Sequence, residues 1–188
     1  MKLPIVLYGN PVLRQKGEDI KEITDEIRQL AQDMIETMHE AHGVGLAAQQ
    51  IGKALQITVL DVADVAERPS RMWISQQEVE LEKYMPMILI NPKIEMTKKK
   101  EVGEEGCLSF PGITADISRG FRVKVEALDL QGKEIKFEAA GLLGRAVQHE
   151  VDHLNGILFI DHISPTTRHS IKDGITAIRH RGQSGQTA

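Results

Sequence analysis

The segment from Gly141 to Gly156, GLLGRAVQHEVDHLNG, constrains the fold more than any other stretch of the chain. If it is helical, His149 and His153 lie one turn apart on the same face, so both imidazoles can reach one point. This is the geometry of a two-histidine metal site on a helix. Glu150 is close enough to reach a water held at that point without binding the metal itself.

A surface helix that carries the H-E-x-x-H pattern by chance is the alternative interpretation. The apolar residues around the pattern indicate instead that the helix is buried; they are Leu142, Leu143, Ala146, Val147, Val151 and Leu154. Polar side chains on a buried helix need partners, and a metal ion is the simplest partner for two histidines one turn apart. Asp152 and Asn155 could orient the ring nitrogens that face away from the metal.

A catalytic metal site usually has three protein ligands and one open position. The third ligand must therefore be a His, Cys, Asp or Glu from elsewhere in the chain. Cys107 is the best candidate, because a thiolate is a strong ligand for zinc or iron(II). It is the only cysteine, so no intrachain disulfide can form, and the chain fits a reducing compartment.

The length and charge of the chain limit the other possibilities. With 188 residues, we expect one domain over residues 1–182, followed by a disordered tail over residues 183–188. The net charge of -4 gives no electrostatic footprint for nucleic-acid binding, and no apolar run could span a membrane. We therefore expect neither DNA nor a membrane as a partner. The N-terminal segment is broken by Pro4, Gly9 and Pro11, and it lacks the apolar core of a secretory signal.

The hydrophobic patterns predict an α+β fold. Apolar residues recur at helical spacing over residues 24–42, and Gly43 is expected to end that helix. Strands are predicted at 56–62 and 87–94, a β-hairpin at 122–130 and 134–139, and a surface excursion at 63–84. Ser164 and Pro165 predict the start of a C-terminal helix. Mainly antiparallel sheets should therefore pack around the central metal-binding helix.

Gly43 and Gly45 lie in a stretch dense in small residues, Gly43 to Gly52. Because glycine has no Cβ, both positions allow a close approach of other backbone. The residues alone leave open whether a neighbouring strand or a bound peptide makes that approach.

Three segments, GVGLAAQQIG, EEGCLSFPG and QHEVDH, resemble the three motifs of the peptide deformylase family in order and spacing. The resemblance implies a bacterial-type enzyme that removes the formyl group from formyl-methionyl nascent peptides and releases formate. It also implies one divalent metal ion, Fe(2+) in the family, with nickel, cobalt or zinc as possible replacements. A bacterial cytoplasmic location follows from the same resemblance, with an organellar enzyme as the open alternative.

The resemblance assigns a role to each matching position. The metal ligands are Cys107, His149 and His153; the general base is Glu150; and the donors to the oxyanion are the Gln50 side chain and the Leu108 backbone. The substrate contacts are Val44, Gly45, Gly106, Leu142 and Ala146. The backbone near Val44, Gly45 and Gly106 would pair with the peptide, and Val44, Leu142 and Ala146 would line the methionine pocket. Glu105 and Arg119 match an ion pair that braces the Cys107 loop.

The sequence leaves alternatives open for the activity, for the position of the Arg145 side chain and for the role of the C-terminal helix. A zinc metallopeptidase of the H-E-x-x-H type and a non-catalytic metal-binding module compete with the deformylase interpretation. Arg145 stands where some relatives carry an aliphatic residue, so its stem either covers the pocket wall with its head in water or points away. The basic C-terminal helix is best interpreted as a solvated face, and transient contact with the ribosome is its functional alternative.

Overall fold

The computed structural model describes all 188 residues and confirms the α+β architecture. One sheet has seven antiparallel strands in the order β1-β2-β5-β8-β9-β3-β4, and β6 and β7 form a separate antiparallel hairpin. The strands are β1 Gly45–Ala47, β2 Ile57–Leu60, β3 Ser70–Ile74, β4 Gln77–Val79, β5 Met87–Met96, β6 Lys100–Gly106, β7 Thr114–Gly120, β8 Arg122–Leu128 and β9 Glu134–Ala140. The predicted strands and the hairpin therefore form, and β1 lies at one edge of the large sheet.

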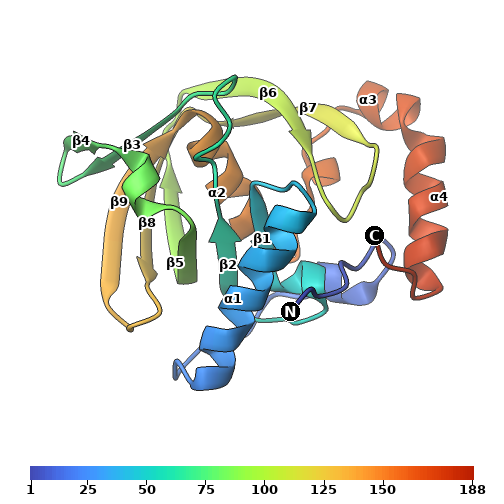
Figure 1. Cartoon of the computed structure of the whole chain (residues 1–188). Helices are drawn as coiled ribbons and strands as arrows, with labels where there is room; N and C mark the ends of the chain where they lie inside the picture. The colour runs from blue at the N-terminus through green and yellow to red at the C-terminus, as the bar shows by residue number, and fades with distance from the viewer.

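Helix α2, Gly141–Leu154, lies at the centre of the molecule, between the large sheet and the β6–β7 hairpin (Figure 1). Its apolar residues pack into the same core as those of the sheet, including Val123 and Phe137. Twelve of its residues are buried, so the buried central helix is confirmed. Its polar side chains consequently face protein, and each needs a partner.

Helix α1, Asp25–Glu40, packs against β1 and β2 through Leu30, Met34 and Met38. The residue that adopts the left-handed backbone after this helix is His42, with φ +54°, rather than Gly43. Gly43 instead donates its N–H to the carbonyl of Met38 at 2.9 Å. The chain therefore leaves α1 and enters β1 within a few residues, beside the central helix.

Residues 63–84, expected to be a surface excursion, also contain regular structure. They form β3 and β4 and a 3-10 helix, η3, at Leu81–Tyr84. Only Met72 of this hairpin is buried, so the alternation that would reveal its strands is weak. The other 3-10 helices are η1 Pro11–Arg14, η2 Ala48–Ile51 and η4 Phe159–Asp161.

The C-terminal helix begins at Ser164 and Pro165 as predicted, and it divides into α3, Pro165–Ser170, and α4, Lys172–Gln183. The sequence predicts a disordered tail over residues 183–188, but the structure shows main-chain contacts in this segment. Thr187 forms an antiparallel bridge with Val6, and the Ala188 N–H donates to the Ile5 carbonyl at 2.8 Å. Such main-chain bonds require no particular side chains, so a tail of small polar residues gives no sequence signal for them. None of the helices is both long and apolar enough to cross a bilayer.

Candidate active site

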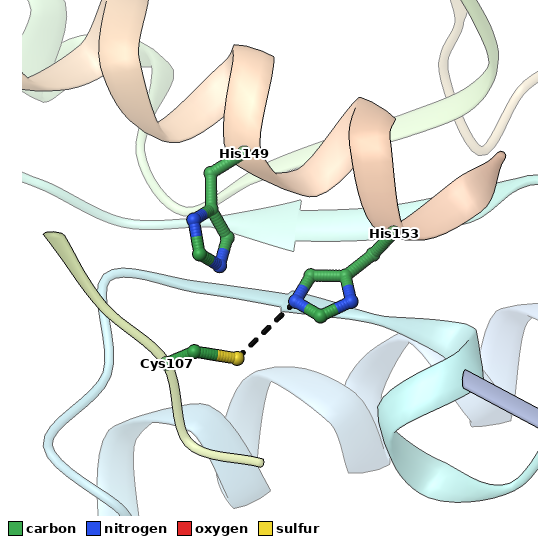
Figure 2. A group of neighbouring side chains, drawn as sticks. All are labelled: Cys107, His149 and His153. Carbon is green, nitrogen blue, oxygen red and sulfur yellow. Dashed lines mark hydrogen bonds between the residues drawn. The ribbon is translucent and has the colours of Figure 1, made fainter. Parts of the chain in front are cut away.

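Cys107, His149 and His153 converge in the structure, as the sequence predicts (Figure 2). One potential ligand atom from each residue lies within 4.8 Å of the others. The thiol follows β6, and the two imidazoles project from successive turns of α2. The Cys107 Sγ lies 3.3 Å from Nε2 of His153, so sulfur and nitrogen point at one small volume.

The orientation of His149 comes from Glu105, and neither Asp152 nor Asn155 contacts its ring. Nδ1 of His149 donates to the Glu105 carboxylate at 2.9 Å. Asp152 instead contacts Arg119 and His162, and the Asn155 amide donates to a backbone carbonyl of its own helix. The sequence prediction for Asp152 and Asn155 is therefore wrong, because the ring partner comes from β6 rather than from the same helix.

The predicted ion pair between Glu105 and Arg119 is present, and both side chains are about 95% buried. Two guanidinium nitrogens of Arg119 donate to the two carboxylate oxygens at 2.9 Å each. Burial acts to raise the pKa of Glu105, but the hydrogen bonds from Arg119 and His149 hold that pKa well below its usual range. Glu105 is therefore a carboxylate that can only accept hydrogen bonds, which fixes the proton of His149 on Nδ1.

Glu150 lies one residue after His149 and is 4% exposed. Its Oε2 atom is buried and has no hydrogen-bond partner within the chain. Burial raises the pKa of Glu150 to about 7. A Cβ at position 45 would overlap Oε1 of Glu150, so the close approach that Gly45 permits is that of this carboxylate. Neither a strand nor a peptide is needed to explain the glycine.

Gln50 lies in η2 and is 1% exposed. Its carbonyl oxygen accepts the N–H of Ala47 at 2.9 Å, which caps the turn, and its amide nitrogen lies 3.6 Å from Cys107 Sγ. The structural role as a cap and the role as a donor toward the site are thus compatible. The backbone N–H of Leu108 donates to no group of the chain.

An open cavity of about 890 Å³ lies over this cluster. The residues expected to contact substrate all line it: Val44, Gly45, Gly106, Leu142 and Ala146. The edge strand β1 and the end of β6 both border it. Arg145 also lines the cavity, but the expectation that its head lies in water is wrong, because its guanidinium is buried under the β6–β7 hairpin.

The donor set fits a divalent transition metal. A thiolate and two imidazoles suit zinc or iron(II), and three ligands leave one position for substrate or water. Burial, and then the charge on His149, lower the pKa of His153, which favours the neutral imidazole that a metal requires. Burial alone would lower the pKa of His149, but Cys107 and Glu105 raise it. The groups that attract a proton to His149 would also attract a metal cation.

Three converging potential ligands, a carboxylate beside them and an open cavity define a metal-dependent hydrolase. The sequence profile described as "Polypeptide deformylase" matches residues 2–169. The chain belongs to the peptide deformylase family. It is 47% identical to the peptide deformylase of Methylacidiphilum infernorum over 183 residues, which cover 97% of this chain and 95% of that protein.

Solved structures agree with this assignment. The peptide deformylase of Thermotoga maritima superimposes with a TM-score of 0.74 at 37% identity, over 88% of this chain and 99% of that one. The enzyme of Synechococcus elongatus, solved in complex with actinonin, gives a TM-score of 0.77 at 36% identity, over 94% of this chain and 85% of that one. This chain thus shares the fold of solved peptide deformylases.

Proposed function

We propose that this chain hydrolyses the formyl amide of formyl-methionyl nascent peptides and releases formate, with Cys107, His149 and His153 as the metal ligands. The observation that carries the proposal is the convergence of these three side chains beside an unpartnered, buried Glu150. These three side chains would hold a divalent ion, which would make a nucleophilic water available at neutral pH.

Glu150 is the proposed general base. Its free Oε2 can take a proton from the attacking water and later deliver a proton to the amine of the departing peptide. Its pKa of about 7 suits both transfers at neutral pH. Gly45 makes room for the carboxylate in this position.

Negative charge develops on the formyl oxygen during attack, and two donors of this chain are free to meet it. The Gln50 amide nitrogen is aimed at the site because the carbonyl oxygen of the same side chain is held by Ala47. The Leu108 N–H has no other acceptor. Donors fixed before the reaction are the groups that stabilise such charge most effectively.

We further propose that the peptide adds as a strand between β1 and the end of β6, near Val44, Gly45 and Gly106. β1 is an edge strand with free main-chain groups, and main-chain pairing does not depend on peptide sequence. The methionine side chain would then enter the apolar part of the cavity, between Leu142 and Ala146.

The testing experiment measures formate release from formyl-Met-Ala-Ser by protein purified without oxygen and supplied with iron(II) or nickel. We expect release that a chelator abolishes. The matched control is Met-Ala-Ser without the formyl group, assayed for amide cleavage. Cleavage of that control without formate release would favour the zinc metallopeptidase and overturn the proposal.

Iron(II) is the metal we propose, in the bacterial cytoplasm, in keeping with the cysteine ligand and the absence of any disulfide. Transient ribosome contact through α4 is a further proposal. It rests on the exposed basic residues of that helix, which are Lys172, Arg179, His180 and Arg181. Co-sedimentation with ribosomes at rising salt tests it, and salt-independent binding would contradict an electrostatic contact.

A further inference from the structure

A second cavity, of about 670 Å³, lies next to the one over the metal ligands. The two cavities share a wall formed by Arg68, Glu104, Leu142 and Arg145. Trp73 and Phe121 line the second cavity but not the first. Leu142 belongs to this wall and also borders the proposed methionine subsite, so the subsite lies against the wall.

Arg145 is the buried charged residue of this wall. It lies on α2 one turn before His149 and is 7% exposed. Its guanidinium donates to the carbonyls of Glu101 and Ile117 at 3.0 and 2.8 Å, and to the Glu105 carboxylate at 3.0 Å. A side chain held by so many acceptors cannot swing aside, so this part of the wall is rigid.

Gly103 on β6 makes room for the guanidinium. A Cβ at this position would lie 2.9 Å from Nη2 and 3.1 Å from Cζ of Arg145. Gly103 is not among the glycines with positive φ, so its backbone would accept a side chain if Arg145 were shorter. Gly103 and Arg145 are therefore matched in size, and together they close the wall.

We propose that Arg145, seated against Gly103, sets the depth of the subsite for the first substrate side chain and excludes chains longer than methionine. The inference rests on the proposed function, because it takes the first side chain to lie between Leu142 and Ala146. Shortening Arg145 joins the two cavities, and a longer alkyl chain can then extend toward Trp73 and Phe121.

The test compares formyl-Met-Ala-Ser with formyl-2-aminodecanoyl-Ala-Ser, in which an eight-carbon chain replaces the methionine side chain. The measured quantity is the ratio of kcat/KM for the long peptide to kcat/KM for the methionine peptide. We expect Arg145→Ala to raise this ratio about tenfold or more, mainly through the KM of the long peptide. Adding Gly103→Leu to Arg145→Ala should refill the wall and return the ratio toward the wild-type value.

Gln148→Ala is the matched control, because Gln148 also ties α2 to the hairpin, through both backbone groups of Gly120, but lines neither cavity. It should leave the ratio unchanged. Leu142→Ala opens the same wall without removing the buried hydrogen bonds, so it should also raise the ratio, and it serves as the test if Arg145→Ala does not fold.

Three results would overturn the proposal that Arg145 limits the depth of the subsite. They are an unchanged kcat/KM ratio in folded Arg145→Ala, an equal rise of the ratio in Gln148→Ala, and no reversal of the ratio by Gly103→Leu. If Arg145→Ala does not fold, an unchanged ratio in Leu142→Ala has the same consequence. Absence of formate from both peptides with the wild-type protein would overturn the proposed function itself, and this inference with it.

Discussion

Glu105 accepts a hydrogen bond from Nδ1 of His149 at 2.9 Å, and this bond leaves Nε2 of the ring to face Cys107. Arg119 and Arg145 donate to the same carboxylate, so two guanidinium groups hold its charge in place. The chain thereby fixes the tautomer and the direction of one proposed metal ligand from a strand residue 44 positions away. Such outer partners commonly govern the affinity of a metal site.

Glu105→Gln is therefore expected to weaken metal binding by about 10- to 100-fold. The amide keeps the shape of the side chain, but it removes the charge and places an NH2 group among donors. Chelator competition, followed by metal analysis of the protein, measures the change. Glu104→Gln, which alters the neighbouring exposed carboxylate, is the control. Equal affinity in both variants would show that Glu105 does not position His149.

Glu150→Gln should reduce kcat for formate release by about two to four orders of magnitude. Metal content and melting temperature should stay close to those of the wild type, because Oε2 of Glu150 makes no hydrogen bond within the chain. Near-normal turnover in this variant would exclude Glu150 as the base. Loss of metal would instead identify it as a ligand.

Gln50→Leu should lower kcat by about two to three orders of magnitude, with a smaller effect on KM, because it removes a donor to the charge formed during attack. Gln49→Leu is the matched control, since Gln49 is equally buried but donates to the carbonyls of Gln15 and Leu154. That variant should lose stability rather than turnover per folded molecule. Equal kcat values for the two variants would contradict the assignment of Gln50.

Features that depend on local spacing could be predicted from the sequence. Residues four apart on a helix share a face, so the pairing of His149 with His153 required no tertiary information. The hairpin of β8 and β9 followed in the same way from alternation across a short turn. Cys107 could also be predicted as the third proposed ligand, because few residue types bind such metals strongly.

Features that depend on how distant segments meet could not be predicted in this way. Glu105 and His149 are brought together only when β6 packs over α2, so Asp152 looked the better partner along the chain. Arg145 appeared solvated or displaced, because nothing near it in sequence shows the carbonyls of Glu101 and Ile117 that surround it. Tertiary placement, rather than residue type, decides such contacts.

The last prediction concerns stability. Asp161 accepts hydrogen bonds from Arg14 at 3.0 Å and from the Leu158 N–H at 2.9 Å, and so ties η4 to η1. Burial acts to raise the pKa of Asp161, but the Arg14 and Leu158 hydrogen bonds lower it below its usual value. The charged form is thus favoured in the folded state. The charged Asp161 side chain therefore contributes to the free energy of unfolding. This contribution is fully present above the unfolded-state pKa of about 3.9, and it is lost as the pH falls through the lower folded-state pKa.

Asp161→Asn should therefore reduce the free energy of unfolding by about 1 kcal/mol at pH 7, since the pair is partly solvated. Urea denaturation at pH 7, 5 and 3 checks this. The difference from the wild type should be constant between pH 7 and 5 and should shrink at pH 3, where the unfolded carboxylate is largely protonated. Glu80→Gln, in an exposed pair with Lys83, should have almost no effect at any of these values. A difference that persisted unchanged at pH 3 would mean that the hydrogen-bond geometry, rather than the charge of Asp161, provides the stabilisation.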